Sequence, residues 1–322
     1  MDRAIIRGIG SYVPDRVLTN ADLESMVETT HEWIVTRTGI ESRHICLDTE
    51  NTSDLCLEAA KHAVANAGIA VCDLDMIVTA TITPDFQFPS TACLIQEKLG
   101  CNDIPCFDLG AACSGFIYAL DVARNSIASN ASIKNVLVIG GEKLSSVVDW
   151  EDRSTCVLFG DGAGAAVISR APGVGETGIL DVLIGADGRC AKLLYCPGSD
   201  VSSGTERHLK MEGREVFKEA VRRMCAAVED ILLRNHLSIE DIACVVPHQA
   251  NTRIITAIAE RVKIPEEKLF VNLAHTGNTS AASIPIALDE AVREGKIQSG
   301  NLVLLVAFGA GMTWGSALVR WT

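Results

Sequence analysis

Short runs of apolar residues recur along the chain, and longer amphipathic stretches separate them. The apolar runs lie at 76–82, 135–141, 164–169, 243–248 and 301–309. Their length and their content of Val, Ile and Leu are typical of strands buried on both faces. Helical periodicity is clearest at 53–69, 215–235 and 251–262. Because strands alternate with helices, the pattern predicts an α/β fold in which helices cover buried sheets.

The second half of the chain repeats features of the first. A helix followed by LDMIVTAT (74–81) is matched by a helix followed by IACVVPHQ (242–249). Near the end of each half an apolar strand runs into glycines, in VLVIGGE (136–142) and VLLVAFGAG (303–311). This similarity predicts a duplicated α/β unit, with one half at 1–173 and the other at 174–322, joined near Pro172–Glu176.

Composition and charge narrow the range of functions. The chain has 322 residues, of which 48% are hydrophobic and only 5% aromatic, so the core is built mainly from small aliphatic side chains. A formal net charge of −13 argues against nucleic acid or an anionic membrane as the main partner. The N-terminus has no signal-peptide pattern, and no stretch reaches the about 18 apolar residues that span a bilayer. We therefore expect a cytoplasmic protein.

Twelve cysteines are scattered along the chain, and no pair has the spacing of a zinc or redox motif. In a protein that is not secreted, most such cysteines are small buried hydrophobes. Neither a disulfide framework nor a metal site is predicted.

Three motifs carry candidate chemistry: Cys113 in DLGAACSGF (108–116), His248 in VVPHQAN (245–251) and Asn278 in HTGNTSAAS (275–283). Cys113 precedes a helical run at 117–128, so the positive end of that helix is expected to lower the pKa of the thiol. His248 ends a predicted strand, where α/β proteins gather ligand-binding groups. Each residue alone has an ordinary structural explanation. Together they predict an enzyme whose reaction passes through a thioester on cysteine.

These motifs resemble those of the β-ketoacyl-acyl carrier protein synthase III family, the thiolase-fold condensing enzymes that start bacterial fatty acid synthesis. The resemblance extends over nearly the whole chain and includes segments 31–40, 83–93, 152–167, 211–221 and 307–320. It implies a thiolase-like fold of two duplicated halves in a layered α-β-α-β-α arrangement. It also implies a homodimer.

The resemblance implies a decarboxylative Claisen condensation. The cysteine accepts an acyl group from a short acyl-CoA, expected to be acetyl-CoA, and the histidine and asparagine then receive malonyl-acyl carrier protein. Loss of CO2 leaves an enolate, whose oxygen two N–H donors from His248 and Asn278 would stabilise. No metal or redox cofactor is implied, because the CoA thioester is a substrate.

Further residues receive roles by the same resemblance. The backbone N–H groups of Cys113 and Ala310 would form an oxyanion hole, provided that Ala310 does not need a positive φ. Trp33 and Arg37, four apart on one helix face, would bind CoA together with Thr29, Arg153 and Asn251. Phe88 would reach across the dimer interface and close the partner's acyl pocket, which favours a short primer.

A basic stripe repeats every four residues at Arg214, Lys218 and Arg222 on an otherwise acidic chain. Phe217, Val221, Met224 and Val228 are expected to form the buried face of the same helix. Such a stripe would attract an acidic carrier protein, and by resemblance the segment Gln249, Ala250, Asn251, Thr252 and Arg253 contributes to that docking surface with Arg214 and Lys218.

Other functions are also compatible with parts of this pattern. A papain-like cysteine hydrolase uses Cys, His and Asn, and the interval from Cys113 to His248 falls within its spacing of about 130–150 residues, but its cysteine environment is missing. A degradative thiolase would need a second cysteine near the C-terminal glycines, and none follows Cys244. A condensing enzyme of a specialised signal or polyketide pathway would share the same three residues. An acyl-CoA-binding scaffold without turnover is the non-enzymatic alternative.

Overall fold

Two β-sheets form the framework of the computed structural model, which describes residues 3–171, 177–198 and 207–322. The first sheet has the order β1 (Arg3–Tyr12), β7 (Gly162–Ala171), β6 (Asn135–Glu142), β4 (Met76–Ala80) and β5 (Cys106–Leu109). The second has the order β11 (Cys244–Pro247), β12 (Leu302–Gly309), β13 (Thr313–Arg320) and β8 (Gly178–Ala186). Two short ribbons pair β2 (Val17–Thr19) with β3 (Ser42–His44) and β9 (Leu194–Tyr195) with β10 (Lys210–Met211).

The two sheets share one topology, as the predicted duplication requires. In the first sheet β4 lies parallel to β6, which pairs antiparallel with β7, and β7 pairs antiparallel with β1. In the second, β11 lies parallel to β12, which pairs antiparallel with β13, and β13 pairs antiparallel with β8. The expected join at Pro172–Glu176 lies outside the described residues, between the last strand of the first unit and β8.

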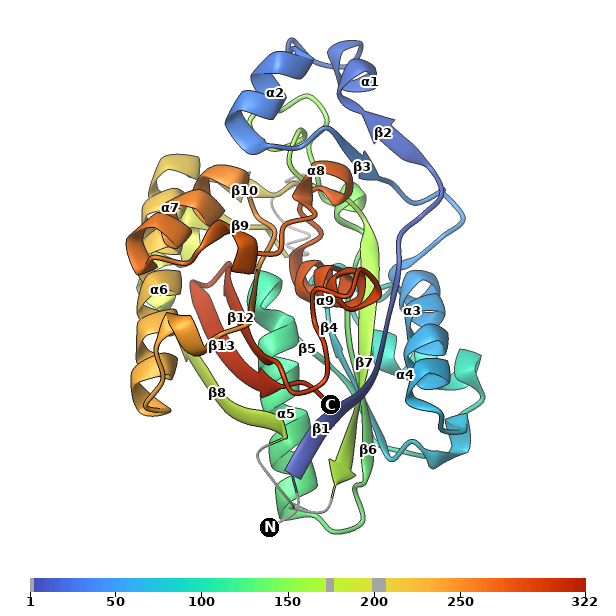
Figure 1. The fold of residues 1–322 in the computed structure, drawn as a ribbon. Coiled ribbons are helices and arrows are strands. Elements are labelled where there is room, and N and C mark those ends of the chain that lie inside the picture. The colour runs from blue at the N-terminus through green and yellow to red at the C-terminus, as the bar shows by residue number, and fades with distance from the viewer. Residues whose placement is uncertain (1–2, 172–176, 199–206) are drawn as a thin grey trace.

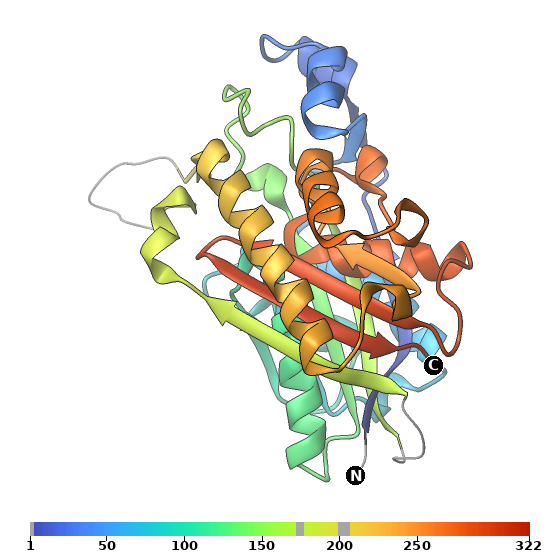
Figure 2. The same ribbon diagram turned by 60° about the vertical axis from the view of Figure 1, so that its left-hand side comes forward.

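Helices fill three layers around the sheets (Figures 1 and 2). The bounds of the layered helices are α3 (Thr52–Ala67), α4 (Thr91–Leu99), α5 (Gly115–Ser129), α6 (Gly213–Arg234), α7 (Thr252–Val262) and α9 (Ser283–Arg293). Between the sheets, α5 and α9 bury apolar residues against both of them. Outside, α3 covers the first sheet, and α6 covers the second. The α-β-α-β-α layering expected from the resemblance is confirmed.

Shorter elements complete the chain. The remaining α-helices are α1 (Asn20–Glu24), α2 (His31–Thr38) and α8 (Leu273–Thr276). The 3₁₀ turns are η1 (Val71–Asp73), η2 (Ala112–Ser114), η3 (Leu144–Ser146), η4 (Gly188–Leu193), η5 (Ile239–Asp241), η6 (Glu266–Lys268) and η7 (Ser280–Ala282). Within the part of the chain that the structure describes, no helix is both long and apolar enough to cross a membrane.

Every strand and helix predicted from periodicity is present, with ends that differ by a few residues. The antiparallel strands β1, β8 and β13 were not predicted from the pattern. Their sequences interrupt the apolar run with arginine, glycine or serine, as in RAIIRGIGSY and TWGSALVR. Because β1 and β8 lie at sheet edges, they do not need the continuous apolar sequence of a central strand.

Candidate active site

The three candidate catalytic residues line one cavity of about 790 Å³. Cys113 lies in η2 beyond the end of β5, and His248 directly follows β11, so each half contributes one of them from the carboxyl end of a strand. Asn278 lies in the turn between α8 and η7. The structure therefore brings together residues that are up to 165 positions apart in the sequence.

Cys113 is buried at the point where η2 leads into α5, as expected. The preceding residue, Ala112, has a φ of 47°, a left-handed conformation that costs about 1–3 kcal/mol for a residue other than glycine. The expected low pKa is wrong for this structure. Burial raises the pKa of the thiol to about 12, because it outweighs the hydrogen bond from Ser280 that lowers the pKa, and the carboxylate of Glu142 adds a smaller contribution in the raising direction.

His248 is also buried, and burial lowers its pKa to about 3, so the imidazole is neutral. Its Nδ1 lies 2.6 Å from Ser283 Oγ, which also accepts a hydrogen bond of 3.3 Å from the Gln249 N–H. Because the Ser283 oxygen already accepts from Gln249, we assign its hydroxyl as the donor to an unprotonated Nδ1, which places the single ring proton of the neutral imidazole on Nε2. The histidine then presents an N–H donor to the cavity.

Asn278 is held by its backbone and by its side-chain oxygen. Its N–H donates to Leu158 O at 2.9 Å, and its carbonyl oxygen accepts from the Gly160 N–H at 3.1 Å. Its Oδ1 accepts from the Ser280 N–H at 2.9 Å. This bond fixes the orientation of the amide and leaves the NH₂ group as the donor for a bound oxygen.

The loop after β12 approaches the backbone of the cysteine closely. A Cβ placed on Gly309 would lie 2.8 Å from Cys113 N, so only glycine fits at the end of this strand. Ala310 lines the cavity and is not among the described residues with a positive φ. The role predicted for its backbone N–H required that Ala310 have no positive φ, and this requirement is met.

At the mouth of the cavity two guanidinium groups stack on the indole of Trp33. Their Cζ atoms lie 5.4 Å (Arg37) and 4.8 Å (Arg153) from the ring centroid. Arg153 also donates to Glu28 O at 2.9 Å, next to Thr29, whose buried Oγ1 has no hydrogen-bond partner among the described residues. Cation–π stacking of this kind gives a rigid, positively charged surface.

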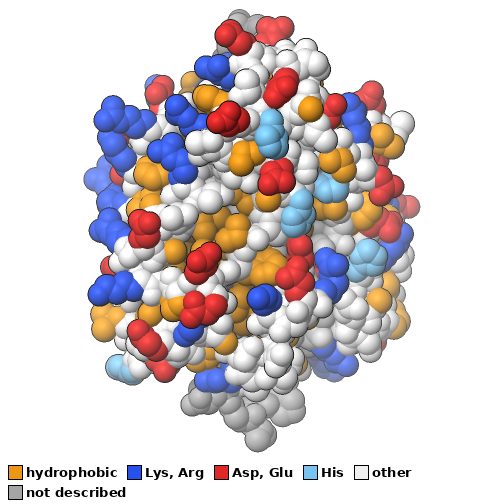
Figure 3. All heavy atoms as spheres, turned by 45° about the horizontal axis from the view of Figure 1, so that its top comes forward, with side chains coloured by type: hydrophobic (Ala, Val, Ile, Leu, Met, Phe, Trp, Pro, Cys, Tyr) orange, Lys and Arg blue, Asp and Glu red, His pale blue; other side chains and the backbone are white. Residues whose placement is uncertain are grey.

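The carrier-docking candidates lie at the same mouth, with one exception. Arg214, Lys218 and Arg253 all line the cavity, and Arg253 stacks 5.8 Å above the ring of Phe217. Figure 3 shows Lys and Arg side chains gathered on the side of the molecule where α6 and α7 lie. Among the remaining candidates, Ala250 and Asn251 are half-buried, and Thr252 is exposed.

Gln249 is the exception, and its assignment to a docking surface is wrong. Its side chain is fully buried, with Nε2 bonded to Pro247 O and Oε1 accepting from the Asn272 N–H. The amide instead stabilises the turn behind His248. Asn251 is likewise engaged, because its Oδ1 caps α7 and its Nδ2 donates to Arg37 O at 3.3 Å.

The two faces expected on α6 also need correction. Lys218 pairs with Glu215 at 2.8 Å and Arg222 with Glu219 at 2.5 Å, so acidic neighbours partly neutralise the stripe. Phe217 and Val221 are only half-buried; both pack against the core, and Phe217 also lines the cavity. Val216 and Ala220 complete the buried face with Met224 and Val228.

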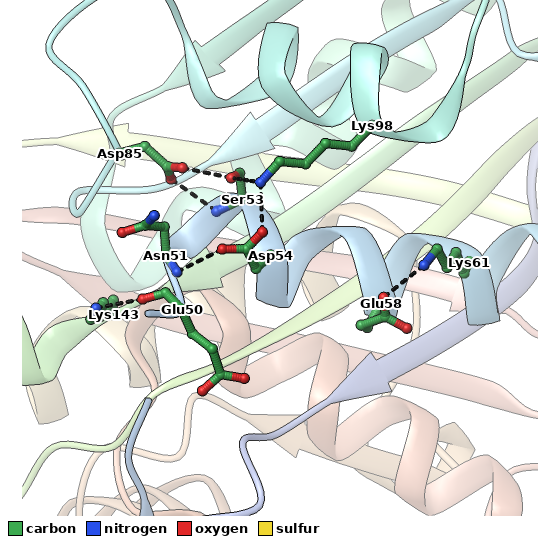
Figure 4. A network of polar contacts seen from close by, with 9 residues as sticks. All are labelled: Glu50, Asn51, Ser53, Asp54, Glu58, Lys61, Asp85, Lys98 and Lys143. Carbon is green, nitrogen blue, oxygen red and sulfur yellow. Dashed lines mark hydrogen bonds and ion pairs between the residues drawn. The ribbon is translucent and has the colours of Figure 1, made fainter. Parts of the chain in front are cut away.

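Phe88 does not line the cavity of its own chain, and its side chain is 84% exposed. The loop that carries it is anchored to the start of α3, where Asp85 accepts from the Ser53 N–H at 2.9 Å and from Ser53 Oγ at 2.5 Å (Figure 4). Lys98 of α4 then joins Ser53 and Asp54, each at 2.6 Å. The exposed ring is thus presented from a fixed loop.

The floor of the cavity is its buried end, where Cys113, His248 and Asn278 lie. Three further polar residues near this floor were not predicted from the sequence. Ser283 and Ser280 lie within the SAAS run, where their hydroxyl groups gave no signal distinct from helix packing. Glu142 ends an apolar strand and is completely buried, and a charge at the end of a buried run is the sequence signal that identifies it. No group of three or more His, Cys, Asp or Glu in the described chain could hold a metal ion.

Two family models match the chain. The model described as 3-oxoacyl-[acyl-carrier-protein (ACP)] synthase III matches residues 107–188, and the model for its C-terminal part matches residues 232–321. The first match contains Cys113, and the second contains His248 and Asn278. The family motifs therefore cover the three residues that meet in the cavity.

Full-length proteins and solved structures are similar to the whole chain. A β-ketoacyl-[acyl-carrier-protein] synthase III from Rhodospirillum centenum is 52% identical over 321 residues, which is 99% of each chain. The crystal structure of a 3-oxoacyl-[acyl-carrier-protein] synthase III from Aquifex aeolicus is 49% identical, with a TM-score of 0.93 over 100% of both chains. The priming β-ketosynthase of the R1128 polyketide pathway is 35% identical, with a TM-score of 0.92 over 99% of this chain and 96% of its own.

Proposed function

This chain belongs to the 3-oxoacyl-[acyl-carrier-protein] synthase III family, and on that premise we propose that Cys113, His248 and Asn278 carry out its condensation. It is an acyl-transferring condensing enzyme that catalyses the initiating condensation of fatty acid synthesis. The substrates are an acyl-CoA, with acetyl-CoA as the expected primer, and malonyl-acyl carrier protein. The products are the β-ketoacyl carrier protein, CoA and CO2.

In the first half-reaction the sulfur of Cys113 attacks the thioester carbon of acyl-CoA. A new S–C bond forms, the bond to the CoA sulfur breaks with its electron pair, and the thiol proton is transferred to the departing CoA. The developing oxyanion needs two donors, and the backbone N–H groups of Cys113 and Ala310 are the candidates. The close approach of Gly309 to the Cys113 backbone supports this assignment.

In the second half-reaction the malonyl group loses CO2, and negative charge develops on the thioester oxygen. The Nε2–H of His248 and the NH₂ of Asn278 are donors held in fixed orientations by Ser283 and Ser280. Preorganised donors in a buried site stabilise such a charge more than water does, because no reorganisation is needed. The neutral imidazole suits this role, since it offers a donor without requiring a buried cation.

The enolate carbon then attacks the acyl thioester on Cys113. A C–C bond forms, the C–S bond to the enzyme breaks, and the sulfur takes up one proton. The observation that carries the proposal is that one cavity contains the buried thiol and two oriented side-chain donors, from both halves of the fold. A hydrolase would have no need for the second pair of donors facing its nucleophile.

The mouth of the cavity fits the remainder of the two substrates. The stacked surface of Trp33, Arg37 and Arg153, with Thr29 beside it, would bind the nucleotide end of CoA. Arg214, Lys218 and Arg253 would contact an acidic carrier protein, with Ala250, Asn251 and Thr252 at the centre of the contact. We still predict that the enzyme needs no metal or redox cofactor.

We also propose a homodimer in which Phe88 of one subunit closes the acyl pocket of the other. The exposed ring on an anchored loop supports this, because an apolar side chain so placed is suited to a partner surface. A phenylalanine at that point would favour a short primer. A cytoplasmic location also remains a prediction. The twelve free cysteines are consistent with it, because thiols stay reduced in the cytosol.

The likeness to a polyketide priming synthase supports one alternative, a specialised pathway with a different primer. A direct test is to supply acetyl-CoA and malonyl-acyl carrier protein together and to measure the 3-oxobutyryl carrier protein by mass. We expect product from the wild type and very little from Asn278→Ala. Product only with acyl-CoAs of eight or more carbons would favour the specialised alternative, and no product with any acyl-CoA would overturn the proposal.

A further inference from the structure

A buried carboxylate lies next to the catalytic cysteine, and the condensation described above does not use it. Glu142 ends β6 with no exposed surface. Its Oε2 accepts hydrogen bonds from Thr83 Oγ1 (2.7 Å), the Ile82 N–H (3.0 Å) and Thr81 Oγ1 (3.1 Å). No arginine or lysine among the described residues forms an ion pair with it. A buried carboxylate that is hydrogen-bonded but not paired with a cation can hold or release a proton.

The hydroxyl of Ser280 connects this carboxylate to the nucleophile. Ser280 Oγ donates to Glu142 Oε1 at 3.0 Å, and Ser280 lines the same cavity as Cys113, where its side chain lowers the pKa of the thiol. A hydroxyl has one proton, so it can donate to only one of these neighbours at a time. When it donates to the carboxylate it can accept the thiol proton, and when it donates to a thiolate the carboxylate must hold the other proton.

The fold holds Ser280 in this position at a cost. Its φ is 51°, a left-handed conformation that a serine adopts only under constraint. Gly140 of β6 allows η7 to approach, because a Cβ there would lie 2.2 Å from Ala281 O. Two non-glycine residues of the cavity lining, Ala112 and Ser280, thus have a positive φ. Such strain collects at functional sites.

We propose that Ser280 and Glu142 form a proton relay that accepts the Cys113 thiol proton during acyl transfer. The inference rests on the proposed function, because it concerns the same nucleophile. The relay supplies a base for the thiol proton, which the position of Cys113 at the start of a helix does not. Such a base is needed because the buried thiol has a raised pKa and the neutral His248 is a weak base. Burial raises the pKa of Glu142 to about 6, which makes it the stronger of the two bases.

The proton balance is closed within the loading step. As the Cys113 sulfur forms its bond to the thioester carbon, its proton moves to Ser280 Oγ, and the Ser280 proton moves to Glu142. The C–S bond of the substrate then breaks, and the CoA sulfur leaves with the electron pair. In the intermediate the CoA sulfur and the Cys113 sulfur are bonded to the same carbon, so both lie near Ser280. The proton held by Glu142 returns through Ser280 to the CoA sulfur, and CoA departs as a thiol.

Few titratable groups face Glu142. Cys113 of η2 and Cys56 of α3 interact with its charge, and both thiols have pKa values raised mainly by burial. The neighbouring elements β4 and η7 carry no titratable side chain in their sequences. Arg170 is the one charged residue of β7, and it lies near the opposite end of the strand from Gly162, the partner of Glu142. Among the described residues, the pKa values of the Cys113 and Cys56 thiols are the ones that the charge of Glu142 raises.

The test is the pH dependence of single-turnover acetylation of Cys113, measured by rapid quench and intact mass between about pH 5 and about pH 9. For the wild type, the rate should rise with pH, bend near pH 6 as Glu142 ionises, and then level off. In Glu142→Gln and Ser280→Ala the bend should disappear, and the rate at pH 7 should fall about 10²-fold. It should then keep rising toward high pH as the thiol itself ionises.

A matched control is Thr81→Val, which removes a hydrogen bond to the same carboxylate but leaves the path through Ser280. It should keep the bend, shifted to higher pH. Malonyl decarboxylation in a Cys113→Ala background should not change when Glu142→Gln is added. Equal loss of decarboxylation and acetylation would mean a structural role and would overturn the relay, as would an unchanged pH profile in Glu142→Gln. No acetylation of the wild type would instead count against the proposed function itself.

Discussion

The floor and the mouth of the cavity use opposite physical environments. On the floor, Cys113, His248, Asn278 and Glu142 are nearly or completely buried, and burial shifts the pKa of each of the three that titrate. Cys113 stays a thiol and His248 stays neutral. At the mouth, Arg37, Arg153, Arg214 and Arg253 are exposed and carry their charges in water.

This difference indicates how the site divides its work. Fixed donors in a dry environment act strongly on charge that appears only in the transition state, so changes on the floor should alter turnover. Exposed cations contribute modestly and are screened by salt, so changes at the mouth should alter substrate affinity. If a change on the floor altered only substrate affinity, or a change at the mouth altered turnover, this division would be wrong.

Asn278→Ala should have the largest effect. Loss of one preorganised donor should lower the rate of malonyl decarboxylation about 10²–10³-fold, because the enolate oxygen loses half of its stabilisation. Acetylation of Cys113 should proceed nearly as in the wild type. Release of CO2 from labelled malonyl carrier protein measures the first rate, and intact mass measures the second. A comparable loss in both would show that Asn278 does not act on the enolate alone.

The buried, neutral His248 should also make the protein acid-sensitive. An unfolded histidine binds a proton below pH 6.5, whereas His248 in the folded chain does so only near pH 3, so stability falls as the pH drops through this window. At pH 5 the contribution is about 2 kcal/mol, a factor of about 30 in the folding equilibrium. Denaturant unfolding at pH 7 and pH 5 should reveal a smaller loss for His248→Gln than for the wild type. The exposed His236→Asn should behave like the wild type.

Ser283→Ala should lower decarboxylation about tenfold, since without its hydroxyl the imidazole can place its proton on either nitrogen. Ser283→Thr should restore most of the rate. Nitrogen chemical shifts of the labelled histidine should report Nε2–H in the wild type and a mixture in Ser283→Ala. A wild-type signal from Nδ1–H would refute the assignment.

Trp33→Ala, at the mouth, should raise KM for acetyl-CoA about fivefold with little change in kcat, because it removes the ring on which Arg37 and Arg153 stack. KM for malonyl carrier protein should stay the same, since that substrate has no nucleotide. Steady-state kinetics with each substrate varied in turn will separate the two effects. A fall in kcat would place Trp33 functionally with the floor.

Arg253→Glu should have the smallest effect, a rise of about threefold in KM for malonyl carrier protein at moderate salt. The rise should diminish as the ionic strength increases. Acetylation by acetyl-CoA should be unaffected. Equal loss of both half-reactions, or an effect that salt does not change, would rule out a docking role for this arginine.

Much of the fold and the core of the site could be predicted from the sequence. Continuous apolar runs identified β4, β6, β7, β11 and β12, because nearly all residues of these strands are buried, whether the strand is central or, like β11, at a sheet edge. Cys113, His248 and Asn278 were found from their motifs, and the structure places them in one cavity.

What could not be predicted depends on tertiary contacts. The raised pKa of Cys113 follows from burial under both halves, which no local motif near a helix start reveals. Gln249 looked like part of an exposed QAN segment, yet its amide is needed inside to bond Pro247 and Asn272. The link between Glu142 and Ser280 joins residues 138 positions apart and depends on strand β6 meeting turn η7.

The central claim is that Cys113 forms an acyl-enzyme, and the most direct test is the intact mass of the purified protein after incubation with acetyl-CoA, beside Cys113→Ala. We predict a gain of one acetyl group by the wild type and none by the variant. An acetyl group on Cys113→Ala, or no adduct on the wild type with acetyl-CoA or longer acyl-CoAs, would contradict the account.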